Sequence, residues 1–154
     1  MTATNNIEEQ PQDGSYSEGK PSAITPQDAE WKPFTVFTRG GIDNGKGKFW
    51  AFLEGAYTSN DTAITLKTTR YRMSGPYEPK NRANINVKIT QDIQQKQHNS
   101  PDTLKQDDVY HPYEVTLTIP RVRDYPPSFN IGIEVDFDGP DGGGWFWTWW
   151  TKEL

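Results

Sequence analysis

One short segment near the C-terminal end constrains the fold of this chain more than any other. From Ser128 to Phe137, apolar and polar residues alternate without interruption. Successive side chains of a β-strand point to opposite faces of its sheet, so this pattern predicts a strand with one buried face. The residues on that face are Phe129, Ile131, Ile133, Val135 and Phe137. Half-buried strands of this kind are typical of antiparallel sheets that cover one side of a core.

Comparable segments occur along most of the chain. Asn84–Thr90 and Tyr113–Ile119 alternate in the same way, and Lys48–Tyr57 is apolar on both faces, which predicts a central strand. The other expected strands are Trp31–Thr38, Ala63–Met73 and Trp145–Lys152. Glycine, proline, asparagine and aspartate separate these segments, as turns require. The chain is therefore predicted to be all-β, an antiparallel β-sandwich or jelly roll of roughly seven strands.

The segment Gln91–Asp108 does not fit this pattern. It is polar and rich in amide side chains, and it lacks alternating apolar residues. We expect a long loop here, with a helical turn near Thr103–Gln106.

The charge of the chain divides it into two parts. Residues 1–30 hold six acidic side chains against Lys20 alone, which accounts for the whole net charge of -5. This part has little apolar surface to offset the entropic cost of ordering, so we expect a disordered acidic tail. Residues 31–154 are expected to form a single β-sandwich domain with no net charge. A neutral domain argues against a nucleic-acid partner, since such proteins usually carry a basic excess.

The sequence also restricts the chemistry and the location of the protein. It contains no cysteine, which excludes disulfides, thiol nucleophiles and Cys-ligated metals. No signal peptide is visible in the polar and acidic first residues, and no apolar run is long enough for a transmembrane segment. We expect a soluble protein that is either intracellular or exported by a non-classical route.

The most unusual feature is the aromatic run between Trp145 and Trp150. In a strand, Trp145, Trp147 and Trp149 share one face, and Phe146, Thr148 and Trp150 share the other. One interpretation is a central strand packed on both sides. The other is a partly exposed face, since indole rings suit stacking on sugars, lipid interfaces and protein hot spots. The ligand-binding candidates are Trp145, Trp147, Trp149, Trp150 and Asp136.

A group of carboxylates precedes the aromatic run. Asp136, Asp138 and Asp141 lie at the predicted strand end and in its glycine-rich turn, where several oxygens could bind calcium. The spacing is not that of an EF-hand. The alternative is a solvated sheet face whose carboxylates pair with arginine side chains.

Catalysis has weak support in the sequence. Glu54 and Glu134 would form a glycosidase pair only if their strands were neighbours with aligned faces. His98 and His111 lack the partners of a metal or nucleophile motif. We therefore expect a protein without enzymatic activity, with a small glycosidase-like jelly roll as the enzymatic alternative.

The leading functional hypothesis is a lectin-like, carbohydrate-binding module with an aromatic platform. Its support is a neutral all-β domain rich in Trp and Tyr, with short polar side chains in its turns. The partner would be a glycan or a ligand at a membrane surface. The alternatives are a membrane-active or receptor-binding β toxin component, and a structural or interaction subunit of a larger assembly. A homo-oligomer is compatible with each of these.

Overall fold

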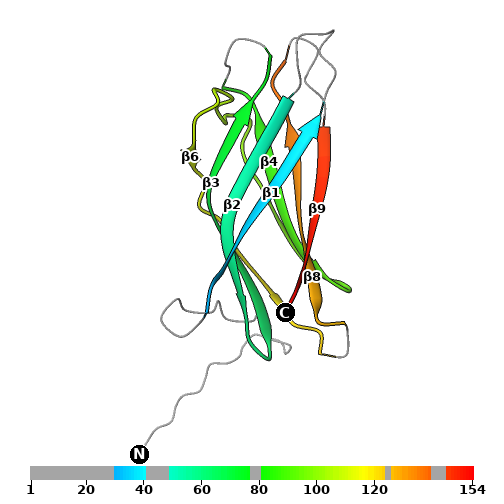
Figure 1. Ribbon diagram of the computed structural model, residues 1–154. Helices are drawn as coiled ribbons and strands as arrows, with labels where there is room; N and C mark the ends of the chain where they lie inside the picture. Colours follow the sequence, from blue (N-terminus) through cyan, green and yellow to red (C-terminus); the bar gives the residue numbers. More distant parts are fainter. Residues whose placement is uncertain (1–29, 41–48, 77–80, 124–125, 140–144) are drawn as a thin grey trace, which may run out of the picture.

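The predicted strands pair into two antiparallel sheets that pack face to face (Figure 1). The structure is a computed structural model that describes residues 30–40, 49–76, 81–123, 126–139 and 145–154. For Trp145 it describes only the backbone. The first sheet has the order β1-β2-β3-β6, and β7 also pairs with β3. The second sheet has the order β5-β4-β8-β9. The prediction of an antiparallel β-sandwich is confirmed.

The strands of the first sheet are β1 (Lys32–Gly40), β2 (Phe49–Ser59), β3 (Ala63–Ser74), β6 (His111–Pro112) and β7 (Thr116–Pro120). Those of the second sheet are β4 (Asn84–Gln91), β5 (Gln94–Asn99), β8 (Ser128–Asp136) and β9 (Trp145–Glu153). The strand that is apolar on both faces, β2, lies between β1 and β3, as its composition predicted. The alternating strand β8 is also central, because it lies between β4 and β9.

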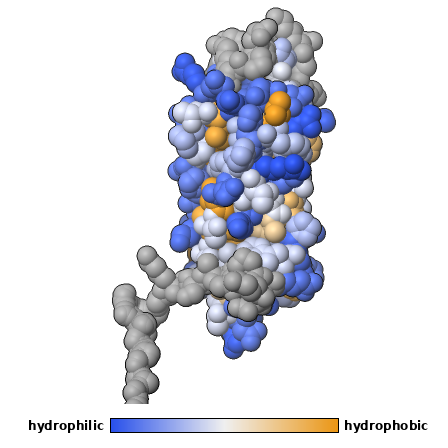
Figure 2. Space-filling view, turned by 90° about the vertical axis from the view of Figure 1, so that its left-hand side faces the viewer, coloured by the Kyte–Doolittle hydropathy of each residue, from blue (hydrophilic) through white to orange (hydrophobic). Residues whose placement is uncertain are grey.

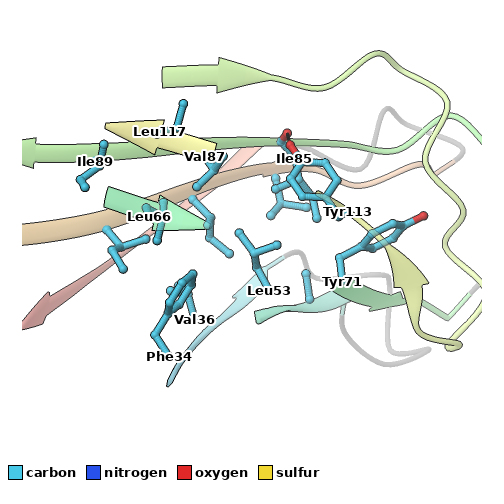
Figure 3. Close-up of a cluster of buried hydrophobic side chains, with 14 of the residues drawn as sticks. Phe34, Val36, Leu53, Leu66, Tyr71, Ile85, Val87, Ile89, Tyr113 and Leu117 are labelled. Atoms are coloured by element: carbon cyan, nitrogen blue, oxygen red, sulfur yellow. Dashed lines mark hydrogen bonds between the residues drawn. The ribbon is translucent and has the colours of Figure 1, made fainter. Parts of the chain in front are cut away.

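The core lies between the two sheets and consists of the inward-facing residues of the alternating strands. Leu53 and Leu66 from the first sheet, and Ile85, Ile131 and Ile133 from the second, have no exposed surface. Figure 3 shows side chains from both sheets meeting in this layer. Burying one such side chain stabilises the fold by about 1.5–3 kcal/mol. The period-two pattern therefore specifies which face of each strand points inward.

One edge of the sandwich is closed by contacts between β1 and β9. The Thr148 hydroxyl donates a hydrogen bond to Thr38 Oγ1 at 2.8 Å. Gly40 lies directly against the ring of Phe146, where a Cβ atom would clash with the aromatic carbons. These contacts hold β9 at the edge of its sheet while its inner face packs on β1.

The segment Gln91–Asp108 differs from its prediction. Gln94–Asn99 forms the edge strand β5, which pairs with β4 through a tight hairpin. Its residues are mostly exposed, so the backbone pairing rather than an apolar face defines the strand. The helical turn expected at Thr103–Gln106 is also wrong, because Leu104 forms an antiparallel bridge with Ala83. The first part of the predicted loop is thus a β-hairpin, and the part after Asn99 holds a single bridge at Leu104.

Two sequence predictions concern parts of the chain that lie outside the described residues: the disordered tail and the calcium ligand Asp141. In the described part of the chain, no helix is long and apolar enough to cross a bilayer.

Candidate functional site

Two exposed tryptophans stand out on the outer face of the second sheet. β9 is an edge strand, and its alternation points Trp147 and Trp149 away from the core. Trp147 keeps 46% and Trp149 49% of its surface exposed. Large aromatic side chains usually bury most of their surface, so a pair left half exposed is a candidate contact surface.

The two indole rings form an exposed aromatic surface, here called the Trp platform. Their planes differ by only 11°, and their centroids are 6.0 Å apart. Residues i and i+2 of a strand are about 6.6 Å apart. Because the rings are nearly parallel at a centroid separation of 6.0 Å, they are stacked. The platform is thus a pair of stacked, half-exposed indoles.

Gly132 on β8 supports the platform from below. It is directly opposite Trp149 in the β8–β9 register. A Cβ atom at Gly132 would lie 2.5–2.9 Å from three consecutive carbons of the six-membered ring of Trp149. Because these three distances are nearly equal, the ring presents its face, not its edge, to the glycine. One face of the indole thus rests on the sheet, and the opposite face points away from it.

Polar side chains continue the outer face beyond the platform. Trp147 on β9 is opposite Glu134 on β8. The row continues from Glu134 to Asn86 on β4 and then to Asn99 on β5. The Asn86 amide donates a hydrogen bond to Glu134 Oε1 at 3.0 Å. Neighbouring strands are about 4.8 Å apart, so this polar row extends across the sheet for roughly 14 Å from the platform.

A second polar row lies on the other side of Gly132. Thr151 on β9 donates a hydrogen bond to Asn130 Oδ1 at 2.6 Å, and Asn130 is opposite Thr90 on β4. Between the two rows, Lys88 on β4 is opposite Gly132 and Gln97 on β5. Hydroxyl, amide, carboxylate and ammonium groups therefore surround the aromatic surface on its β8 side.

The structure divides the predicted ligand-binding residues between two faces. Trp150 lies on the inner face of β9, with its ring 5.6 Å from Phe34 and 5.9 Å from Tyr57, and packs against the core. It does not join the platform. The backbone of Trp145 is opposite Asp136, and the side chain of Trp145 lies outside the described part of the chain.

The carboxylates predicted to bind calcium are only partly described. Asp136 is the last residue of β8, and Asp138 follows two positions later. The backbone N–H of Asp138 donates a hydrogen bond to Gln106 Oε1, and the backbone carbonyl of Asp138 accepts one from Gln106 Nε2, each at 2.9 Å. Among the residues that the structure describes, no group of three or more His, Asp or Glu side chains could hold a metal ion. Calcium binding by these residues stays a prediction without structural support.

Burial and negative neighbours raise the pKa of Asp136 above its ordinary value. Burial has the largest effect, and the charges of Asp102, Asp138 and Glu134 add to it. The end of β8 near the platform is therefore a region of negative potential.

The structure separates the two carboxylates considered for catalysis. Glu54 lies on the outer face of the first sheet and Glu134 on the outer face of the second, with the core between them. They cannot form a glycosidase pair. His111 is bound to Asp107 at 2.8 Å, and the ring of His98 lies 6.2 Å from that of Tyr113. Both histidines are thus accounted for by contacts within the fold.

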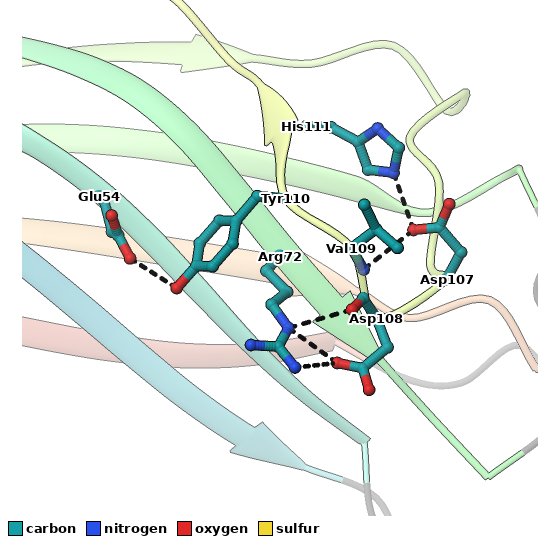
Figure 4. A network of polar contacts seen from close by, with 7 residues as sticks. All are labelled: Glu54, Arg72, Asp107, Asp108, Val109, Tyr110 and His111. Carbon is teal, nitrogen blue, oxygen red and sulfur yellow. Dashed lines mark hydrogen bonds and ion pairs between the residues drawn. The ribbon is translucent and has the colours of Figure 1, made fainter.

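The outer face of the first sheet carries a network of charged and aromatic groups (Figure 4). Arg70 pairs with Glu54 at 2.8 Å and stacks 3.9 Å from the Tyr110 ring centroid, and the Tyr110 hydroxyl donates to Glu54 at 2.7 Å. Burial acts to raise the pKa of Glu54, but the hydrogen bonds from Tyr110 and Arg70 outweigh it, and the pKa is lowered. Arg72 binds Asp108 at 2.8 Å.

These charges satisfy one another, and the network fastens the segment that leads to β6 onto β3. The side of the sandwich with β3 and β6 faces the viewer in Figure 2, where the surface is mostly hydrophilic and the apolar patches are small and separate. A pocket on the described surface, lined by residues that include Glu30, Thr58 and Leu154, has a volume of only about 90 Å³. Small-molecule sites usually measure about 300–1,000 Å³. The platform is therefore the better candidate for a binding site.

Sequence reasoning identified Trp147 and Trp149 but missed Gly132 and the polar rows. A glycine inside an otherwise regular strand was the available signal, since it often marks a close approach of another group. Comparison of the chain with protein-family models, with curated proteins and with solved structures found no match.

Proposed function

We propose that this protein is a carbohydrate-binding module, and that the glycan lies on the outer face of the second sheet. The observation that carries the proposal is the Trp platform, with two half-exposed, stacked indoles whose planes differ by 11°. Pyranose rings have apolar C–H faces, which stack on flat aromatic surfaces. The exposed indole surface of the platform would take a sugar ring of an oligosaccharide.

The polar rows would give the site its selectivity. Binding sites combine an apolar surface with a few polar groups that fix the orientation of the ligand. Glu134 accepts from Asn86, and Asn130 accepts from Thr151, so these side chains are held in place before a ligand arrives. Preorganisation lowers the entropic cost of binding. Their remaining donors and acceptors would bind sugar hydroxyls.

A glycan array probed with the labelled protein tests the proposal, followed by affinity electrophoresis in soluble β-glucan, xylan and galactomannan. The test variants are Trp147→Ala and Trp149→Ala. Trp50→Ala is the matched control, because Trp50 lies on the outer face of the other sheet beside Phe52 and Arg72. We expect each test variant to lose about tenfold or more in affinity, which is about 1.4 kcal/mol, and the control to bind like the wild type.

Three other results would overturn the proposal. A blank array together with binding to phosphatidylcholine–phosphatidylserine vesicles that requires Trp147 would favour a membrane-active component. A blank array together with self-association that Trp149→Ala abolishes would favour a subunit of an assembly. Equal glycan binding by all three variants would show that the platform is not the site.

A further inference from the structure

The acidic end of the platform has a hydrogen-bonding arrangement that the proposed function does not explain. β4 begins at Asn84 and β8 ends at Asp136, and these two residues are opposite each other. Asp102 binds Asn84, and Asp138 follows β8 after one residue. We call these four residues the acidic end. Asp136 is opposite the backbone of Trp145 and diagonal to Trp147, so the acidic end adjoins the platform.

Asn84 presents an acceptor that no donor reaches. Its amide nitrogen donates to the Ser100 carbonyl at 3.0 Å and to Asp102 Oδ1 at 2.7 Å. Because both partners accept hydrogen bonds, the amide orientation is fixed and Oδ1 is left over. This oxygen is buried without a partner, in a side chain that is only 6% exposed. A buried acceptor without a donor is destabilising, and such a group is usually satisfied by another protein group or by ordered water. Asn84 Oδ1 therefore has room for a donor that the described chain does not supply.

One carboxylate oxygen of the acidic end is likewise unmatched. Asp138 Oδ2 is buried without a hydrogen-bond donor. Among the described residues, the ion pairs are those of Glu54, Asp61, Asp107 and Asp108, so none neutralises the acidic end. Arg82 and Lys105 are exposed and form no ion pair with it. This region thus offers several oxygen acceptors and negative charge, without a matching donor or cation from the described chain.

We propose that the acidic end is a subsite for the ammonium group of an amino sugar, so that the preferred glycan contains unacetylated hexosamine. This inference rests on the proposed function and specifies its ligand. An ammonium group supplies three donors and one positive charge, which matches the free acceptors and the negative potential. A metal ion fits less well, because no three His, Asp or Glu side chains of the described residues are arranged to hold one.

The test compares three oligosaccharides of equal length: chitosan oligomers, their fully N-acetylated counterparts and cello-oligosaccharides. Binding is measured by titration calorimetry at a mildly acidic pH that keeps the sugar amine protonated. We expect the wild type to prefer the amino oligomer by about tenfold, and Asp136→Asn to lose that preference while its affinity for the acetylated oligomer is unchanged. Glu153→Gln is the matched control, because Glu153 is an exposed carboxylate at the opposite end of β9.

A folding control accompanies the binding data. Asp136→Asn removes a carboxyl group whose pKa is raised in the folded state. The melting temperature of this variant at neutral pH should therefore not be lower than that of the wild type. Should this variant fold poorly, Asp102→Asn replaces it, with the same loss of preference expected.

The outcomes separate this inference from the proposed function. Equal affinity for the amino and acetylated oligomers, with both lost in Trp149→Ala, would overturn the inference and leave the proposed function standing. Absence of binding to every glycan would overturn both. A calcium-dependent rise in melting temperature that Asp136→Asn abolishes would replace the ammonium subsite with a metal site.

Discussion

Gly132 shows how one residue can define a binding surface. Its missing side chain leaves the space that one face of the Trp149 indole occupies. Gly132→Ala would place a methyl group against that face and lift the ring from the sheet. We expect a stability loss of about 1–3 kcal/mol, typical of overpacking, together with weaker glycan binding. Urea unfolding monitored by circular dichroism measures the first effect, and affinity electrophoresis the second.

A double-mutant cycle checks that this cost arises from the indole. In a Trp149→Ala background the methyl group has nothing to clash with, so Gly132→Ala should be nearly neutral there. An equal stability cost in both backgrounds would show that the backbone at Gly132, and not its contact with Trp149, determines the effect.

At this scale the sequence predicted which face a side chain occupies but not which distant groups it meets. Alternation alone placed Trp147 and Trp149 together and Trp150 on the opposite face of the strand. The contact of Trp149 with Gly132 depends on the register between β8 and β9, and the bond of Asn84 to Asp102 depends on the path of a loop. Neither has a local signature in the sequence, because each joins residues that are 16 or more positions apart.

The hairpin between β4 and β5 is the element that sequence analysis missed most clearly. Gln91 pairs with Gln94, so the connection consists of Asp92 and Ile93. Asp92 has a φ of 53°, a left-handed conformation that favours glycine and disfavours other residues. Polar, exposed strand residues conceal the strand, because an edge strand without a buried face has no apolar alternation. Backbone pairing with β4, whose apolar residues are buried in the core, holds β5 in place without a buried face of its own.

The hairpin yields a prediction at the level of the element. Asp92→Gly removes the strain of a positive φ, so we expect it to raise the free energy of unfolding by up to about 1 kcal/mol. Ile93→Gly is the control: no positive φ occurs at Ile93, and glycine there should lower stability through backbone entropy. Thermal and urea unfolding of both variants measure the difference. A destabilised Asp92→Gly would mean that its side chain stabilises the turn in another way.

The position of β9 in its sheet also decides a question that composition left open. The aromatic run was compatible with a strand packed on both sides or with one exposed face. β9 pairs with β8 along one side, its inner face packs on β1, and its outer face is uncovered in the described structure. Strand order therefore selected between the two interpretations, and strand order is a property of long-range pairing that a single sequence does not contain.

Considered as a whole, the molecule has two outer faces of different character. On the first sheet, Arg70 and Arg72 are paired with carboxylates and covered in part by Tyr110. On the second sheet, the Trp platform is uncovered, and two buried acceptors of the acidic end, Asn84 Oδ1 and Asp138 Oδ2, have no donor. Groups that satisfy one another stabilise the fold, whereas an uncovered aromatic surface is available to a ligand. This contrast is the reason for placing the binding site on the second sheet.

Substitutions on the inner face of the second sheet should therefore change stability, and substitutions on its outer face should change binding. Ile133 and Trp147 are close in the β8–β9 register but point to opposite faces, with Ile133 completely buried and Trp147 46% exposed. Ile133→Ala should lower the free energy of unfolding by about 2–5 kcal/mol and leave glycan affinity of the folded fraction unchanged. Trp147→Ala should do the reverse, because it removes an exposed ring and leaves no cavity. Urea unfolding and titration calorimetry on both variants test this separation. If Trp147→Ala instead lost several kcal/mol of stability, the ring would contribute mainly to the packing of the fold, and the platform would no longer be a candidate binding surface.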